Sequence, residues 1–165
     1  MSVAYASHAI APIARMYRLN EYFFGQALDG LSVEELWRRP AENANPMIWI
    51  AGHMTDTRAV VLKALHEDFE LPWGEQFKRY CKVGEPSQYP DVAQIRSAMA
   101  DISERIRSRL AAVTDEQLDQ FATGVGVPNA RTLMHEIAQL AWHDSYHLGQ
   151  MAYLRKALGF DGLVG

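Results

Sequence analysis

The sequence contains a single cysteine, Cys81, among its 165 residues. One cysteine cannot form an internal disulfide, and chains poor in cysteine are typical of reducing compartments. No apolar run approaches the roughly 20 residues needed to span a bilayer. The first residues also lack the basic start and the long apolar stretch of a signal peptide. We therefore expect a cytoplasmic protein that does not bind membranes.

Positive charge is also scarce. There are 16 lysines and arginines against 20 aspartates and glutamates, so the formal net charge is −4, and the basic residues form no block. The charge pattern gives no electrostatic reason to expect nucleic-acid binding. Hydrophobic residues make up 48% and charged residues 22%, which is ordinary for a globular protein. A chain of this length is predicted to form one domain, residues 1–165.

Apolar residues recur every three or four positions in four long segments, which is the period of amphipathic helices. The segments begin near Pro12, Pro46, Pro90 and Thr132, and the first is expected to stop at Gly30. Asn45 is the expected N-cap of the second segment, which runs to about His66, and Asn129 or Thr132 caps the last, which runs to Leu158. Capping boxes at Ser32 and Thr114 predict short helices that end near Trp37 and Phe121. No strand pattern is convincing, so we predict an all-α four-helix bundle.

Residues 68–89 interrupt the helical pattern with two glycines, two prolines and five aromatic residues. This segment is too long for a simple turn, and it predicts a long crossover connection between the second and third long helices. Its aromatic residues either pack on the bundle or cover the mouth of a pocket. Gly52 lowers the stability of its helix by about 1 kcal/mol relative to alanine, which suggests that a bulky group or another backbone comes close to it.

His143 and His147 lie four residues apart in the last segment, so both side chains leave the same face of the helix. That face is otherwise apolar, and a third histidine, His53, lies in an apolar row of the second long helix with Trp49, Asp56, Val60 and Ala64. Burying three imidazoles without partners would cost several kcal/mol, and a shared metal removes much of that cost. We interpret the three histidines as metal ligands. Core histidines satisfied by other hydrogen bonds are the structural alternative.

Two other polar groups in the last segment are less suited to catalysis. His135 and Glu136 resemble the start of a zinc-protease motif, but residue 139 is Gln where the second histidine would be. Asp144 follows His143 directly, so it points about 100° away from that face and is a poor general base for a metal held there.

Two stretches together resemble the DinB-like (DinB/YfiT) metalloenzyme superfamily. They are Trp49-Ile-Ala-Gly-His53-Met-Thr-Asp-Thr-Arg58 and His143-Asp-Ser-Tyr-His147-Leu-Gly-Gln150-Met-Ala-Tyr-Leu-Arg155. The resemblance covers essentially the whole chain, with the same order of four long helices and the same extended link. It implies that the three histidines bind a divalent metal inside a bundle. It also implies a homodimer.

Three protein ligands leave a coordination position open for a water molecule, a thiol or a substrate carbonyl. Neutral imidazoles suit zinc, nickel or iron(II). The resemblance implies either hydrolysis or transfer of a low-molecular-weight thiol to a small electrophile, and we favour thiol transfer because no inward Glu lies beside the ligands. Hydrogen-bond partners of the rings or residues lining the pocket are predicted among Asn20, Asp56, Gln139, Tyr146 and Gln150. A non-catalytic protein that binds a metal or a small molecule is the alternative function.

Overall fold

The structure is a computed structural model, and it describes residues 4–78, 83–124, 127 and 129–164. Cys81 lies outside these ranges. Within them the protein has six α-helices and one short 3-10 helix, and the only strand-like pairing is an isolated bridge between Phe121 and Thr132. The prediction of an all-α protein is confirmed. In the described ranges no helix has the length and apolarity of a membrane-spanning segment.

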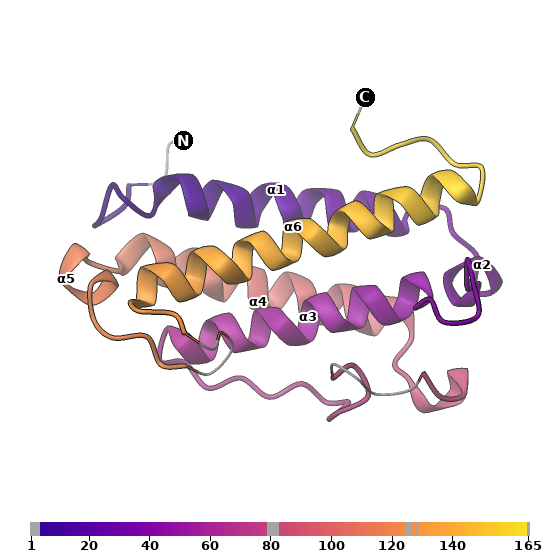
Figure 1. Cartoon of the computed structure of the whole chain (residues 1–165), viewed down its shortest axis with the longest axis horizontal. Helices are drawn as coiled ribbons and strands as arrows, with labels where there is room; N and C mark the ends of the chain where they lie inside the picture. Colours follow the sequence, from indigo (N-terminus) through magenta and orange to yellow (C-terminus); the bar gives the residue numbers. More distant parts are fainter. Residues whose placement is uncertain (1–3, 79–82, 125–126, 128, 165) are drawn as a thin grey trace.

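Four long helices form the bundle (Figure 1): α1 (Ala11–Leu28), α3 (Met47–Ala64), α4 (Val92–Ala112) and α6 (Leu133–Ala157). Helix α1 packs against α4 and α6, and α3 packs against the same two helices. Figure 1 shows that α1 and α6 run in one direction while α3 and α4 run in the other. Because α3 and α4 are parallel neighbours, their connection has to return along the bundle. Residues 65–78 and 83–91 belong to that return, with the 3-10 helix η1 (Pro86–Gln88) near its end. The predicted crossover connection is confirmed.

The predicted helix ends are mostly correct. Gly30 adopts a φ of +75° just after α1, which is the left-handed conformation that ends many helices. The capping boxes of Ser32 and Thr114 are present and open the short helices α2 (Val33–Trp37) and α5 (Asp115–Leu118). Thr132, and not Asn129, caps α6, because its hydroxyl accepts a hydrogen bond from the backbone N–H of His135.

Three boundaries differ from the prediction. The N-cap of α3 is Pro46 and not Asn45, which instead lines two cavities beside α3 and α6. Helix α3 ends at Ala64, because His66 turns the chain with a φ of +58°. Helix α5 ends at Leu118, and the side chain of Phe121 is 95% exposed, so it offers no apolar contact that would extend the helix.

The bundle core consists of two apolar clusters separated by a layer of polar side chains. Each long helix contributes one member of this polar layer: Asn20, Arg58, Ser103 and Asp144, all buried. Arg58 donates from Nε to Oδ2 of Asp144 at 2.7 Å, and it also donates to the Ser103 hydroxyl and to the backbone carbonyl of Tyr17. The Arg58–Asp144 ion pair therefore joins α3 to α6 inside the core.

The three histidines do not lie inside the core as predicted, although both helical rows that contain them supply core residues. Trp49 and Ala64 on α3 are buried, and so are Leu133, Ile137, Leu140, Met151 and Leu154 on α6. On α3, Trp49, His53, Asp56 and Val60 line a cavity beside the bundle, while Met54, Arg58 and Val61 occupy the core. On α6, His143 and His147 are half-buried beside the same cavity, and at their level of the helix Asp144 and Leu148 occupy the core. The reason is that the crossover connection covers an outer face of α3 and so creates a second partly buried surface.

Phe77 packs closely on α3 from the crossover connection. Its side chain is fully buried, and a Cβ atom placed on Gly52 would lie 2.2 Å from its ring. The expectation that a bulky group approaches Gly52 is confirmed. Trp73 is also buried, so both of these aromatic side chains pack on the bundle.

Candidate metal site

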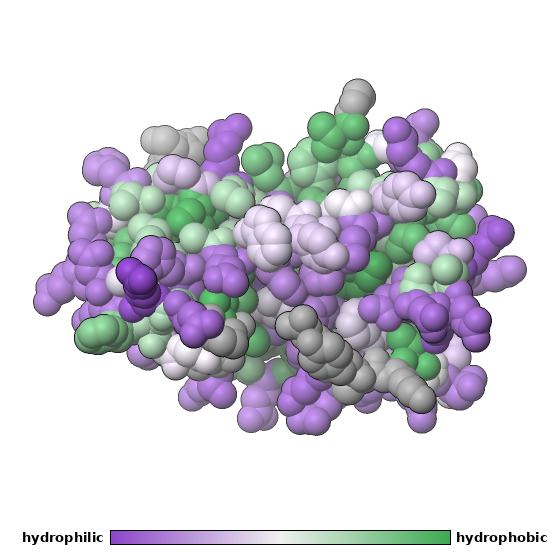
Figure 2. Space-filling model, viewed as in Figure 1, coloured by the Kyte–Doolittle hydropathy of each residue, from purple (hydrophilic) through white to green (hydrophobic). Residues whose placement is uncertain are grey.

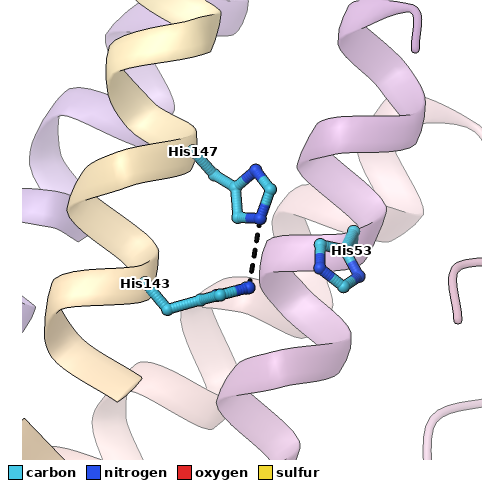
Figure 3. A group of neighbouring side chains, drawn as sticks. All are labelled: His53, His143 and His147. Atoms are coloured by element: carbon cyan, nitrogen blue, oxygen red, sulfur yellow. Dashed lines mark hydrogen bonds between the residues drawn. The ribbon is translucent and has the colours of Figure 1, made fainter. Parts of the chain in front are cut away.

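Three imidazole rings meet between α3 and α6 (Figure 3). His53 comes from α3, and His143 and His147 come from successive turns of α6. One ring nitrogen from each lies within 4.8 Å of the others, and Nε2 of His143 is 3.1 Å from Nε2 of His147. In a tetrahedral zinc site with bonds of about 2.0–2.1 Å, two nitrogen ligands lie roughly 3.3 Å apart. The pair on α6 is therefore already at the spacing that one shared cation requires.

The orientation of His53 is set by the crossover connection. Its Nδ1 lies 2.8 Å from the backbone carbonyl oxygen of Phe77. A carbonyl oxygen only accepts hydrogen bonds, so Nδ1 carries the proton and Nε2 keeps its lone pair. Trp49, one turn earlier on α3, stacks on the ring with 5.0 Å between centroids. The close packing of Phe77 on Gly52 thus places a carbonyl where it selects the tautomer that can bind a metal.

The orientation of His147 is set from its own helix. Its Nδ1 lies 2.7 Å from Oε1 of Gln150, which accepts the ring proton and leaves Nε2 facing His143. Gln150 is held in turn by a hydrogen bond from its Nε2 to the hydroxyl of Tyr146. Burial lowers the pKa of His147 to about 4, and the hydrogen bond with Gln150 acts in the opposite direction with a smaller effect. The ring is therefore neutral at pH 7, as a metal ligand must be.

Replacing Gln150 by alanine is expected to weaken zinc binding by about 10- to 100-fold, the range typical of hydrogen-bond partners of ligating histidines. The loss comes from freeing the His147 ring to rotate and to change tautomer. A Gln150→Glu variant keeps an acceptor oxygen and should recover most of the affinity. Competition titration against a chelator of known affinity measures all three proteins. Equal zinc affinity in the wild type and in Gln150→Ala would contradict this role of Gln150.

The rings face a cavity of about 610 Å³ between α3, α6 and the crossover connection, which we call the site cavity. Asp56 lies one turn after His53 and lines it, and burial raises the pKa of its carboxyl group. Gln139 and Lys78 also line it. Of the other predicted residues, Gln150 bonds a ring, and Tyr146 packs edge-on against His147 with 5.1 Å between centroids.

Asn20 lies away from the site cavity. Its amide donates to the Ser145 hydroxyl at 2.9 Å and to the Ala141 carbonyl at 3.3 Å, and so it joins α1 to α6 within the polar layer. Asn20 is therefore a buried amide bonded to a neighbouring helix, and it does not have the predicted place beside the rings or in the site cavity.

The donor set fits a divalent metal. His53 and His147 have their Nδ1 atoms bonded outward to oxygen acceptors, which directs Nε2 inward in both. Three neutral nitrogen donors with an open side are characteristic of catalytic zinc sites, whereas structural zinc sites have four protein ligands. The three histidines can therefore hold one ion. The metal itself stays a prediction.

Two buried carboxylates near these histidines have structural roles that the sequence analysis did not identify. Asp144 pairs with Arg58, as described above. Glu136 is fully buried and accepts hydrogen bonds from the backbone N–H and the hydroxyl of Thr123, both at 2.9 Å. It anchors the segment between α5 and α6, which explains why a His-Glu pair occurs here without a metalloprotease motif.

Comparison with known proteins agrees with this architecture. The model of one protein family, described as the DinB superfamily, matches residues 23–151. The chain belongs to the DinB superfamily. Its fold is similar to that of YfiT from Bacillus subtilis, which is described as a probable metal-dependent hydrolase with an unusual four-helix bundle topology. The TM-score is 0.69 at 14% sequence identity, covering 91% of this chain and 87% of that one, so this likeness shows the fold alone. No curated protein matches the sequence significantly.

Proposed function

We propose that this DinB-superfamily protein is a metal-dependent hydrolase of small molecules. The observation that supports this most directly is the combination of three convergent imidazoles with a half-buried carboxyl group, Asp56, around one cavity. A divalent cation in such a site supplies positive charge that polarises a substrate oxygen and acidifies a water molecule. YfiT, which has the same fold, is itself described as a probable metal-dependent hydrolase.

Asp56 is the group on this chain best placed to move a proton. It is three residues after His53 on the same face of α3, so it projects beside that ring into the site cavity. Burial raises its pKa, which makes its carboxylate a better proton acceptor than an exposed one. In hydrolysis Asp56 would take a proton from the attacking water and return it to the leaving group as the substrate bond breaks. From the sequence we favoured thiol transfer because no inward Glu lies beside the ligands. Asp56 supports hydrolysis instead, because it offers a carboxyl group in the same cavity.

Replacing Asp56 by asparagine is expected to lower kcat/KM by about 100-fold or more, because positioned proton transfer typically contributes 10²–10⁴-fold. Asparagine keeps the shape and the polarity of the side chain but cannot accept the proton. Zinc content should be unchanged, since Asp56 is not among the three ligands. Turnover of small ester and amide substrates by zinc-loaded protein measures the effect. Full activity in Asp56→Asn would rule out this role for Asp56.

Thiol transfer is the second proposed function. The site cavity, at about 610 Å³, is large enough to hold a small thiol and an electrophile side by side, and a coordinated thiol is readily deprotonated. Incubating zinc-loaded protein with cysteine and an aromatic chloride, in parallel with the ester and amide panel, separates the two reactions. Turnover of neither set, with zinc firmly bound, would favour a non-catalytic binding protein. The homodimer implied by the resemblance also stays a proposal, which sedimentation tests.

A further inference from the structure

A second cavity of about 580 Å³ lies next to the site cavity along α6, and we call it the neutral groove. Asn45 lines both cavities, and Gln150, which lines the neutral groove, bonds the ring of His147 in the site cavity. The two cavities are therefore separated by little more than the side chains of Tyr146, His147 and Gln150. A molecule with one end at the histidines would place its other end in this groove.

The lining of the neutral groove differs in kind from that of the site cavity. None of the described residues that line it carries a formal charge, whereas Asp56 and Lys78 line the site cavity. Its walls are two tyrosine rings, the aliphatic side chains of Ile50 and Leu154, and the side-chain amides of Asn43, Asn45 and Gln150. In Figure 2 the surface over the middle of α6 is pale, the colour of side chains of intermediate hydropathy. Such a surface suits an uncharged group that is partly apolar.

Tyr146, Gly149 and Tyr153 follow one another at steps of three and four residues, so they lie on one face of α6. The tyrosines are 52% and 73% exposed, and they are separated by about 10 Å along the helix. A flat ring stacked between two others needs roughly 7 Å, at about 3.5 Å per contact. The backbone positions of Tyr146 and Tyr153 are therefore far enough apart along α6 for one aromatic ring to fit between them.

Gly149 keeps this gap open. Glycine in an exposed helix interior lowers helix stability relative to alanine, so a packing reason for it is expected. Among the residues that the structure describes there is none, because a Cβ atom placed on Gly149 would have no atom within 4 Å beyond its chain neighbours and the nearby backbone of its own helix. This contrasts with Gly52, where the ring of Phe77 fills the space. Trp142 stacks on Tyr146 from the side away from Gly149, with 5.9 Å between centroids, and steadies that wall of the gap.

From these observations we infer that the neutral groove binds an uncharged aromatic part of the substrate whose reactive group lies at the three histidines. The ring stacks over Gly149 between Tyr146 and Tyr153, and the amides of Asn45 and Gln150 bond a polar linker. The substrate class is thus a small molecule with a hydrolysable group joined by a short linker to a neutral aryl group. This inference rests on the proposed metal site.

The test uses zinc-loaded protein and hydroxamates, which bind zinc through their oxygen atoms. Calorimetry compares acetohydroxamate, which has no tail, with hydroxamates that carry a phenyl group on alkyl chains of increasing length. We expect the best phenyl-tailed compound to bind the wild type at least about tenfold more tightly than acetohydroxamate, an effect of the size that aromatic stacking plus apolar burial supplies. Tyr153→Ala should lose most of that gain and bind acetohydroxamate as the wild type does.

A variant that fills the neutral groove distinguishes a loss of binding in the groove from a general effect on folding. Gly149→Leu should raise the melting temperature by a few degrees, because leucine is a better helix former at this open position. It should also abolish the gain from the phenyl tail. Tyr22→Ala, which removes a 60% exposed tyrosine on α1, is the matched control and should keep the full gain in affinity.

A phenyl tail that adds no affinity in the wild type, or a gain that survives in both Tyr153→Ala and Gly149→Leu, would overturn the inference but would not contradict the metal site. Failure of zinc or acetohydroxamate to bind the wild type would overturn the proposed function and this inference with it.

Discussion

Replacing His147 by alanine is expected to abolish stoichiometric zinc binding. The variant keeps only His53 on α3 and His143 on α6 as ring donors. It loses the ring whose nitrogen lies 3.1 Å from that of His143 and whose tautomer is fixed by Gln150. The zinc affinity should fall by more than about 100-fold, which is the largest loss typical when a hydrogen-bond partner of a ligating histidine is removed. Zinc at about 100 times its dissociation constant should stabilise the wild type by about 2.7 kcal/mol and should leave the variant unchanged. Metal analysis after dialysis and thermal melts with and without zinc measure both effects.

His135→Ala is the matched control, because His135 is also on α6 but its Nδ1 lies beside the Thr132 hydroxyl in the first turn. This variant should bind zinc as the wild type does. If His147→Ala merely lowered the stability of the metal-free protein and left zinc binding intact, the histidines would be structural and the proposed function would fail.

Replacing Arg58 by alanine is expected to lower the free energy of unfolding by about 3–5 kcal/mol, the cost typical of leaving one partner of a buried ion pair uncompensated. Both side chains are essentially inaccessible, with 0% and 1% of their surface exposed, so solvent does not screen the charge left on Asp144. The Ser103 hydroxyl and the Tyr17 carbonyl lose a donor as well. Urea denaturation of the metal-free protein measures the change.

The double variant Arg58→Met with Asp144→Leu is the informative control. Replacing both members of a buried pair by apolar residues of similar size is often neutral or stabilising, so it should be far more stable than Arg58→Ala. It should also bind zinc more weakly than the wild type, because the ion pair fixes the position of α6 relative to α3 directly beneath the histidines. A loss of less than about 0.5 kcal/mol in Arg58→Ala would contradict the role given to the pair.

The sequence predicts those parts of the fold that depend on residues close to one another along the chain. The two capping boxes, the stop at Gly30 and the four amphipathic segments each depend on residues within one or two turns of each other. The crossover connection followed from its length and its content of glycine and proline. The four-residue spacing of His143 and His147 likewise placed both rings on one face without knowledge of the partner helix.

The parts that could not be predicted depend on contacts between distant segments. Arg58 and Asp144 are 86 residues apart, and a charged residue in a helix is usually solvated, so no local signal marks them as a buried pair. The acceptor of His53 is a backbone carbonyl at Phe77, which no residue type reveals. Gln150 is different, because its three-residue spacing from His147 is visible in the sequence, from which it was predicted to partner a ring or line the pocket.

Diffraction from zinc-soaked crystals, recorded on both sides of the zinc absorption edge, tests the central claim most directly. Coordination by all three histidines should give one anomalous peak between α3 and α6, about 2.0–2.1 Å from a ring nitrogen of each of His53, His143 and His147, with a coordination position open toward the site cavity. A zinc peak elsewhere on the chain, or a peak bonded to fewer than these three rings, would contradict it.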